Sequence, residues 1–299
     1  MRGAELTWAL SERRVHATLV VPFERPHDDL LNIRVRRLPR VESEADAREA
    51  ARALLDDHRP DLLVVDSFPS GPAGELRGLS LPPSILLARL HRDANEAGYA
   101  RDASVFERVL DLEPHLDWLP LPAEPFGPVA RAPRPGADAP EVDALFVASE
   151  PELEGLFLRV APSLGGRVCV ARAAGLSTDG SDAYPWLLDR VRPRVIVGPA
   201  GFNLTYEARA AGLTHLAVPR PRRFDDQARR AEAVATRVRS PRHLLRLLQD
   251  PRAPSDAAQP TTLSARRASS SRGRIGPGDS GPGSTAARAR FSSSTMSHW

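Results

Sequence analysis

The chain has 299 residues, and its 41 basic and 38 acidic side chains leave a formal net charge of +3 at pH 7. The basic side chains are all arginines, because the sequence contains no lysine, and this excludes mechanisms that need a phosphate-loop lysine, a Schiff-base lysine or a serine–lysine dyad. The length suits two modest domains, and the near-neutral charge gives no reason to expect specific binding of nucleic acid.

The single cysteine, Cys169, cannot form an internal disulfide, and the N-terminus lacks the apolar core of a signal peptide. These features predict an intracellular, cytoplasmic protein. No run approaches the roughly 18 consecutive apolar residues that a membrane-spanning helix needs. Peripheral contact with the inner face of the membrane is compatible with this prediction. No His, Asp and Cys residues have metal-ligand spacing, so no metal site is expected.

The first half of the chain alternates between helical and extended patterns. Apolar spacing predicts a helix over the first dozen residues, a second from Glu42 to His58 and a third over 103–113. Short apolar or extended runs typical of strands lie at 14–22, 32–39, 60–68, 83–90 and 115–126. Alternation of strand and helix is typical of a parallel sheet.

The composition changes to Pro, Gly and Ala at 127–141, which predicts a domain boundary. The second half repeats the alternation, with strands expected at 142–148, 166–171, 194–198 and 214–219. Helices are expected at 150–162, 183–191, 203–211, 224–238 and 241–250. We therefore predict an α/β protein with two Rossmann-type, doubly wound parallel sheets. The expected parts are a first domain at 1–130, a linker at 131–140, a second domain at 141–253 and a disordered Arg/Ser/Gly/Pro tail at 254–299.

The stretch GPAGFNLTYEARAAG, residues 198–212, follows the predicted strand RVIV. Ligands of open parallel sheets bind beyond the carboxyl ends of the strands, where a helix N-terminus presents free N–H groups. Gly198 and Gly201 would permit a tight turn, and Asn203 or Thr205 could cap the helix. The amides suit a diphosphate, and Glu207 could accept two hydrogen bonds from a ribose diol. The alternative is that Glu207 merely favours the helix dipole and Gly201 only forms a turn.

One strand later, the polar loop PRPRRFDDQ opens another helix from the same edge of the sheet. Asp226 and Gln227 would then project into the same cleft. Arg220, Arg222 or Arg223 could stabilise an anionic leaving group there, and a solvated loop is the alternative.

The stretches GPAGFNLTYEARAAG and VPRPRRFDDQARRAE together resemble the donor-binding half of GT-B glycosyltransferases. The resemblance is to the group with a family-28-type C-terminal domain, which includes the N-acetylglucosaminyl transferases of peptidoglycan synthesis. It implies two domains that face a cleft. It also implies three sets of contacts with the donor. The diphosphate would be bound by the amides of the turn, at Gly198, Ala200, Gly201 and Asn203, together with Thr205. Glu207 would bind the ribose, and Asp226 with Gln227 would contact the sugar. The chain departs from the family in having Pro-Ala-Gly where His-Gly-Gly is frequent.

The opening RGAELTWAL and the following RRVHATLVV resemble the helix and second strand after the Gly-His loop of this family. Arg2 would be the arginine that follows the histidine by three residues, which implies that the first strand and the loop lie upstream of Met1. Asp66, at the end of LLVVD, resembles the segment that faces the cleft and is the candidate base, with a helix cap before PAGEL as the alternative. His91 is the histidine expected to face the cleft, with a structural role as the alternative.

This resemblance implies a glycosyltransferase that moves a sugar from a UDP-type donor, such as a UDP-N-acetylhexosamine, to an unknown acceptor hydroxyl. The acceptor would be a glycan, a lipid-linked molecule or a small molecule. The nucleotide sugar would be a co-substrate, and no metal or other cofactor is expected. Two alternatives are a non-catalytic nucleotide-sugar-binding remnant and a sugar-nucleotide epimerase of the same fold.

Overall fold

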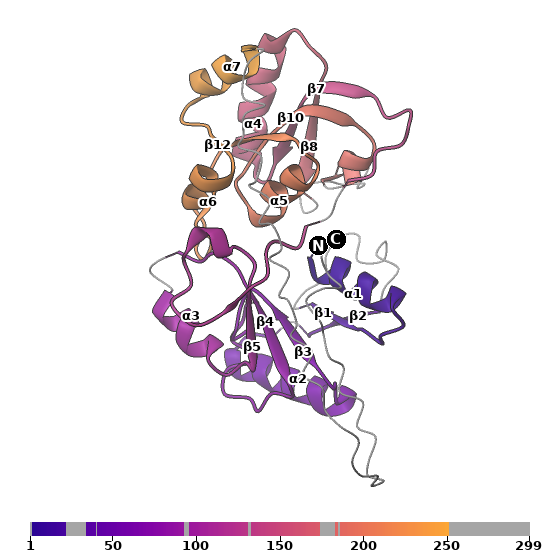
Figure 1. The fold of residues 1–299 in the computed structure, drawn as a ribbon, viewed down its shortest axis with the longest axis vertical. Helices are drawn as coiled ribbons and strands as arrows, with labels where there is room; N and C mark the ends of the chain where they lie inside the picture. The colour runs from indigo at the N-terminus through magenta and orange to yellow at the C-terminus, as the bar shows by residue number, and fades with distance from the viewer. Residues whose placement is uncertain are drawn as a thin grey trace, which may run out of the picture. The chain divides into compact units, whose positions relative to one another are not determined.

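The computed structural model describes residues 2–21, 34–39, 41–92, 96–130, 133–173, 183–184 and 186–250. These residues all belong to one compact unit, Met1–Ala257. The tail predicted from 254 onward lies outside the described residues. The described strands form three parallel sheets, of two, four and six strands (Figure 1).

The two-stranded sheet follows the first helix. Helix α1 spans Arg2–Glu12, β1 spans Leu19–Val21 and β2 spans Val35–Arg37. Helix α2 (Glu44–His58) comes next, as the apolar spacing predicted. It begins after Ser43, whose hydroxyl accepts a hydrogen bond from the Asp46 N–H, and this cap fixes its first turn. The strand expected upstream of Met1 stays a prediction.

The four-stranded sheet has its strands in chain order. They are β3 (Leu63–Asp66), β4 (Ser84–Ala88), β5 (Arg108–Asp111) and β6 (Glu124–Pro125). Helix α3 (Glu96–Ala103) joins β4 to β5, and a single 3-10 turn, η3 (Pro114–Leu116), follows β5.

The prediction of a helix over 103–113 is wrong, because most of this segment forms β5 and its flanks. Leu110 pairs with Leu87 of β4, and Val109 and Leu110 are both buried, so this strand is covered on both faces. A short apolar run without alternation looks the same in a buried strand as in a buried helix. Pairing with β4 decides between the two, and the local sequence does not show that pairing.

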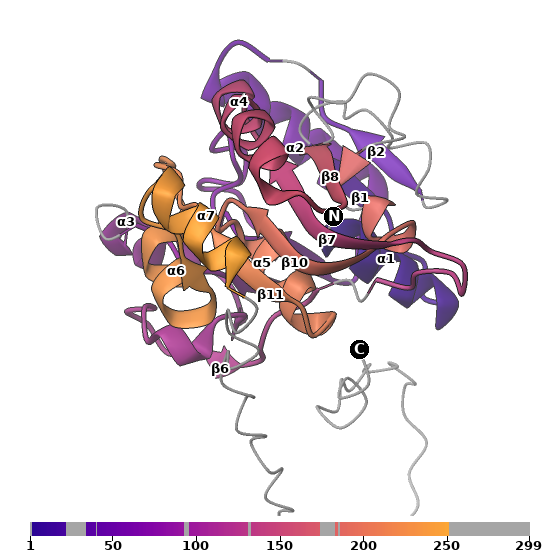
Figure 2. The same cartoon turned by 90° about the horizontal axis from the view of Figure 1, so that it is seen from above.

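The six-stranded sheet contains the second half of the chain. Its strands are β7 (Glu141–Ala148), β8 (Val168–Ala173), β9 (Ala183–Tyr184), β10 (Arg192–Gly198), β11 (Thr214–Ala217) and β12 (Thr236–Arg237). The spatial order is β12-β11-β10-β7-β8-β9, so the direction of winding reverses between β7 and β10; Figure 2 lets the reader follow β11, β10 and β7. Such a reversal is the switch point at which doubly wound sheets bind ligands.

The helices of this sheet are α4 (Pro151–Val160), α5 (Phe202–Ala210), α6 (Gln227–Val234) and α7 (Pro241–Gln249), with 3-10 turns η4 (Ala161–Leu164) and η5 (Trp186–Asp189). Two predicted helices differ from the structure. The segment 183–191 forms β9 and η5 where it is described, and the helix expected over 224–238 is confined to α6. It is short because Asp226 caps its start and Thr236 pairs with β11 beyond its end.

Consecutive side chains of β7 alternate between two hydrophobic clusters. Phe146 packs with residues of α4 and α7, whereas Leu145 and Val147 pack with residues of α5 and η5. This period of two is what a strand covered on both faces requires. The sheet is therefore doubly wound, as the sequence predicts.

Candidate functional site

The turn after β10 lies at the switch point of the six-stranded sheet and leads directly into α5. Gly201 is the N-cap residue of α5, and no side chain caps the helix. The prediction that Asn203 or Thr205 serves as the cap is therefore wrong. Both residues lie inside the helix, Asn203 half-buried and Thr205 buried. A helix that starts without a side-chain cap leaves its N-terminal amides for another partner, and an anion suits them.

Two polar side chains of α5 are almost completely buried behind this turn. Thr205 is 1% exposed, and its hydroxyl has no hydrogen-bond partner in the described part of the chain. Glu207 is 2% exposed. A buried hydroxyl without a partner is uncommon in native proteins and calls for an explanation such as a ligand.

The two glycines of the turn meet different surroundings. A Cβ atom on Gly198 would lie 2.5 Å from Leu204 Cδ2 and 3.1 Å from the carbonyl oxygen of Val147, whereas one on Gly201 would lie 3.8 Å from Gln227 Nε2. Neither glycine has a positive φ. Gly198 is therefore required by packing between β7 and α5, and Gly201 is not required by the protein itself.

This contrast gives a testable expectation. We expect Gly198→Ala to lower the free energy of unfolding by about 1 to 3 kcal/mol through overpacking. We expect Gly201→Ala to cost less than about 1 kcal/mol, because its new methyl group meets only ordinary contact distances and the cost is limited to a poorer N-cap residue. Urea unfolding of both variants measures the difference. Equal destabilisation by the two substitutions would contradict this account of the turn.

Gln227 and Asp226, which the sequence places in the same cleft, behave differently from one another. Gln227 is 5% exposed, its amide nitrogen lies beside Gly201, and its Oε1 accepts a hydrogen bond of 3.0 Å from the Arg220 N–H. Asp226 caps α6, and its Oδ1 accepts a hydrogen bond of 3.0 Å from the Arg229 N–H. The structure thus brings Gln227 to the turn and uses one oxygen of Asp226 to start the next helix.

Two arginines of this loop are held by a carboxylate that the sequence did not single out. Glu150, which follows β7, lies 2.9 Å from Arg220 Nη2 and 2.6 Å from Arg222 Nη2. The guanidinium of Arg223 instead lies 4.7 Å from the ring centre of Phe224. The carboxyl ends of β7 and β11 are therefore joined by ion pairs at the same edge as the turn.

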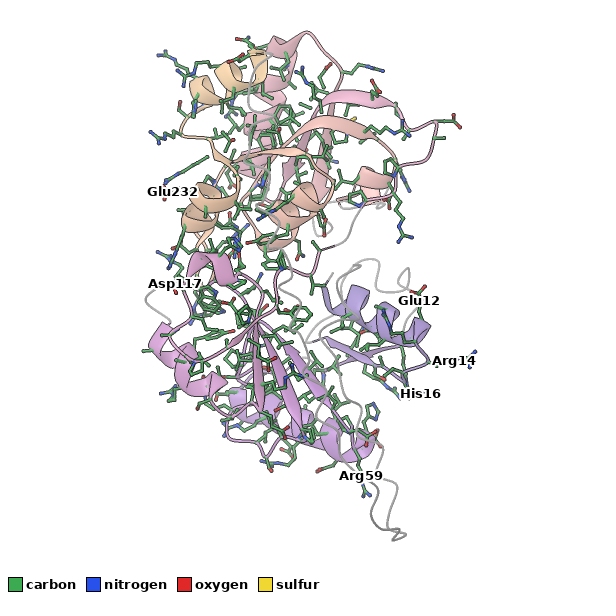
Figure 3. All side chains as sticks on the ribbon, in the orientation of Figure 1. Glu12, Arg14, His16, Arg59, Asp117 and Glu232 are labelled. Carbon is green, nitrogen blue, oxygen red and sulfur yellow. The ribbon has the colours of Figure 1, made fainter. Side chains whose placement is uncertain are left out.

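Asp66 is the last residue of β3, and His91 follows the neighbouring strand β4. Asp66 is exposed, and its Oδ1 accepts a hydrogen bond of 2.7 Å from the hydroxyl of Ser67, which has a φ of 75°. Figure 3 labels three other non-glycine residues with positive φ, Arg14, Arg59 and Asp117. No helix starts after Asp66 in the described chain, where the backbone forms turns, so the alternative of a helix cap is wrong.

His91 is 3% exposed and lies among aromatic side chains. Its ring centre is 4.3 Å from that of Tyr99, 5.6 Å from that of Phe68 and 6.4 Å from that of Phe224. Burial lowers the pKa of His91 to about 4, so the ring is neutral at pH 7. Arg2 begins α1, and its side chain lies outside the described part of the structure.

The largest polar feature near the turn is a buried ion pair between Glu113 and Arg230, which the sequence analysis missed. Both side chains are 0% exposed, and Arg230 donates to both carboxylate oxygens, at 2.6 and 2.9 Å. Glu113 also accepts a hydrogen bond from the Tyr206 hydroxyl at 2.9 Å. Burial alone would raise the pKa of Glu113, but the Arg230 guanidinium holds it below its usual range.

Arg230 also supports the turn directly. Its Nη1 donates to the carbonyl oxygen of Ala200 at 3.0 Å and to Asp225 Oδ1 at 2.7 Å. Ala200 is itself fully buried. The buried guanidinium of Arg230 therefore fixes the Ala200 carbonyl of the turn. Only the pattern FDDQARR indicated a polar cluster here, and it did not identify the partner 117 residues away.

Solved structures of other proteins show which known fold this chain resembles. SsfS6, a glycosyltransferase of Streptomyces sp. SF2575, matches with a TM-score of 0.55 and 16% identity, over 84% of this chain and 89% of SsfS6. SsfS6 complexed with thymidine diphosphate matches with a TM-score of 0.54 and 16% identity, over 85% of this chain and 88% of that one. MurG of Acinetobacter baumannii matches with a TM-score of 0.52 and 15% identity, over 82% and 85%.

The chain has the GT-B fold. At such low identities the likeness concerns the fold, and a fold by itself does not establish an activity. No family model matches the sequence, and no curated protein matches it. Within the described residues of this GT-B chain, no group of three His, Cys, Asp or Glu side chains could hold a metal ion. None of its described helices is both long and apolar enough to cross a bilayer.

Proposed function

We propose that this chain is a glycosyltransferase that binds a nucleoside diphosphate sugar at the turn after β10. The observation that carries the proposal is the uncapped start of α5, together with the buried hydroxyl of Thr205, about one turn into the helix, which has no partner in the described chain. The amides at the start of α5 and the Thr205 hydroxyl are donors that suit a diphosphate. The solved structure of SsfS6 with thymidine diphosphate supports this choice of ligand class.

In this proposal the second half of the chain, 141–253, is a donor-binding domain of the family-28 type and the first half, 1–130, binds the acceptor. Glu207 accepts hydrogen bonds from the ribose, and Gln227 with Asp226 contacts the sugar. Glu207 lies on the helix that starts at the turn, and a carboxylate can accept hydrogen bonds from both hydroxyls of a ribose. The base of the donor nucleotide is a pyrimidine, with uracil as the first choice.

The transfer itself joins an acceptor hydroxyl to the anomeric carbon as the bond from that carbon to the diphosphate oxygen breaks. The nucleoside diphosphate leaves with the bonding electron pair, and the hydroxyl proton passes to a base. The amides at the start of α5 would stabilise the charge that develops on the leaving group. Asp66 is the candidate base, because its carboxylate is exposed at the carboxyl end of β3.

Calorimetric titration with UDP, thymidine diphosphate and UDP-N-acetylglucosamine tests the donor site. We expect Glu207→Gln to weaken binding by about 1.5 to 3 kcal/mol, because it removes a charged hydrogen-bond acceptor. Glu152→Gln, an exposed position on α4, is the matched control and should bind as the wild type does. Thermal unfolding of each variant shows that the fold is retained.

The outcomes separate the alternatives. Failure of the folded wild type to bind any of the three nucleotides would contradict the proposal. Binding without release of nucleotide from UDP-sugars would favour a non-catalytic nucleotide-sugar-binding protein. If release occurs and Asp66→Asn slows it without changing donor affinity, Asp66 has the role of the base; equal rates would remove it from that role.

A further inference from the structure

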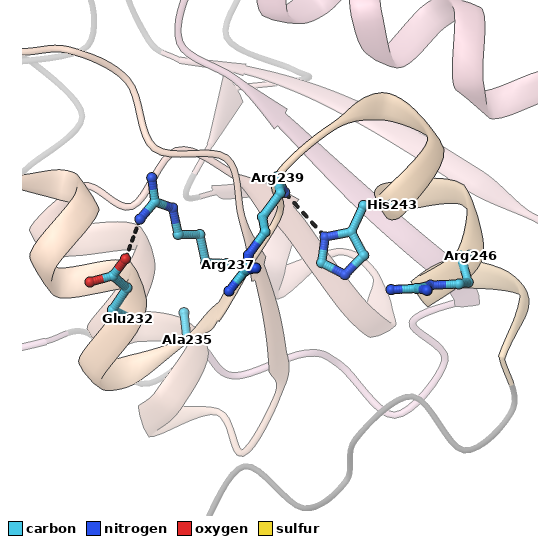
Figure 4. A pocket seen from close by; sticks show the side chains of 6 residues that line it. All are labelled: Glu232, Ala235, Arg237, Arg239, His243 and Arg246. Carbon is cyan, nitrogen blue, oxygen red and sulfur yellow. Dashed lines mark hydrogen bonds and ion pairs between the residues drawn. The ribbon is translucent and has the colours of Figure 1, made fainter.

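A hollow lies at the end of β12, and none of the residues of the turn after β10 line it. Its volume is about 530 Å³, which is in the range of ligand pockets. Six side chains line it (Figure 4), and they come from α6, β12 and α7 with the segments between them: Glu232, Ala235, Arg237, Arg239, His243 and Arg246. None of these residues belongs to the proposed donor site.

The lining is strongly basic. Three guanidinium groups stand against one carboxylate, and that carboxylate, on Glu232, is bound to Arg237. Within the described residues, the guanidinium groups of Arg239 and Arg246 have no carboxylate partner. The hollow therefore carries an excess of two positive charges, which a dianion would neutralise.

His243 adds a directed donor to this charge. Its Nδ1 accepts a hydrogen bond of 3.2 Å from the Arg239 N–H, so in the neutral ring the proton is on Nε2. The backbone here is fixed, because the Ser240 hydroxyl accepts a hydrogen bond from the His243 N–H and caps α7. The imidazole N–H and the guanidinium groups of Arg239 and Arg246 line one space (Figure 4).

A less polar hollow of about 580 Å³ adjoins this one and shares Arg237 and Arg239 with it. Leu156, Val218 and Leu244 contribute apolar side chains to its wall. An anionic group held by the shared arginines would thus have apolar space next to it. This arrangement suits a phosphate ester whose organic part is apolar.

We propose that the hollow at β12 and α7 binds a phosphoryl dianion, carried by a small phosphate ester or by a lipid headgroup. Guanidinium groups match phosphate oxygens in both charge and geometry, because they donate two parallel hydrogen bonds. This phosphoryl site shares no residue with the proposed donor site, so substitutions in its lining test it separately.

The test uses the full chain with two probes, inorganic pyrophosphate and phosphatidylcholine vesicles with or without phosphatidic acid. We expect Arg239→Gln and Arg246→Gln each to weaken binding of one probe by about tenfold or more, as loss of a charge-assisted hydrogen bond should. Arg242→Gln, one turn from Arg246 on α7, removes the same charge outside the lining and should change binding less than about twofold.

Each outcome has a defined meaning. Binding of pyrophosphate alone supports a soluble phosphate ester, and vesicle binding that requires phosphatidic acid supports a lipid headgroup. The proposal is overturned if neither probe binds, or if Arg242→Gln weakens binding as much as Arg246→Gln. Arg239→Gln and Arg246→Gln also separate this site from the proposed donor site, because they should weaken pyrophosphate binding and leave the UDP affinity measured by calorimetry unchanged.

Discussion

Glu113→Gln should lower the free energy of unfolding by about 3 kcal/mol, because it removes the carboxylate that binds two nitrogens of the buried Arg230 guanidinium and leaves the single ion pair with Asp225. Both groups are completely buried, so water cannot replace the lost carboxylate. Urea unfolding at pH 7, followed by circular dichroism, measures the change. The expected loss is a large share of the roughly 5 to 15 kcal/mol that stabilises a typical protein.

A matched control lies on the surface. Glu124 forms a two-fold hydrogen-bonded pair with Arg108, at 2.7 Å for each bond, but both side chains are at least 40% exposed. We expect Glu124→Gln to cost no more than about 1 kcal/mol. If the two substitutions lower the free energy of unfolding equally, the Glu113–Arg230 pair is accessible to water, and it does not fix the turn after β10 in the way described.

The pair also predicts a response to acid. The pKa of Glu113 is held below its usual range in the folded protein, so its contribution to stability is fully present above about pH 4.3, the ordinary value. That contribution is lost as the pH falls from there toward the folded pKa. Glu113→Gln should therefore unfold with a weaker dependence on pH in this acidic window than the wild type does.

The second large effect is expected between pH 6.5 and pH 5, from two buried histidines. Burial lowers the pKa of His91 and of His215 from 6.5 to about 4. Both rings are neutral in the folded protein, whereas in the unfolded chain they take up protons below pH 6.5. The free energy of unfolding is therefore highest above pH 6.5 and decreases as the pH falls. Between pH 6.5 and pH 5 each histidine should cost about 1.5 kcal/mol of stability, or about 3 kcal/mol together.

Urea unfolding at both pH values, with wild type and His215→Val, measures this effect. The variant should lose about half of the pH dependence, because a neutral β-branched side chain replaces one titrating ring in β11. His16→Gln is the control, since His16 is exposed. An unchanged pH dependence in His215→Val, or an NMR titration that puts the His215 pKa near 6.5, would contradict the prediction.

Much of the six-stranded sheet could be predicted from the sequence because its strands are short apolar runs and its helices have a clear apolar stripe. β7, β10 and α7 lie close to their expected bounds for this reason. The segment 103–113 could not be assigned correctly, because the pairing of Leu110 with Leu87 is a contact between distant parts of the chain. Local patterns contain no information on such contacts.

The backbone of the candidate site could be predicted from the sequence, but the charged side chains that contact this backbone could not. The glycine turn and Gln227 follow from the position of the loops at one sheet edge, and the structure places them side by side. The Glu113–Arg230 pair was missed because charged residues are normally exposed, and nothing in the sequence marks these two as buried. Glu150 was missed because its ion pairs are with arginines 70 or more positions away. The capping of α5 was predicted wrongly because Asn203 and Thr205 are good cap residues but lie two and four positions after the actual N-cap residue, Gly201.

The Glu113–Arg230 pair also limits how this protein can be recombined with others. The two residues are 117 positions apart and lie on opposite sides of the proline-rich segment at 131–140, where a chimera would naturally be joined. Replacing the second half alone would leave the Glu113 carboxylate buried without its guanidinium, and replacing the first half alone would leave Arg230 with Asp225 as its remaining ion pair, unless the incoming half brought its own counterpart. The two halves are therefore exchangeable only as a matched set, and the choice of parents for a chimera starts from positions 113 and 230.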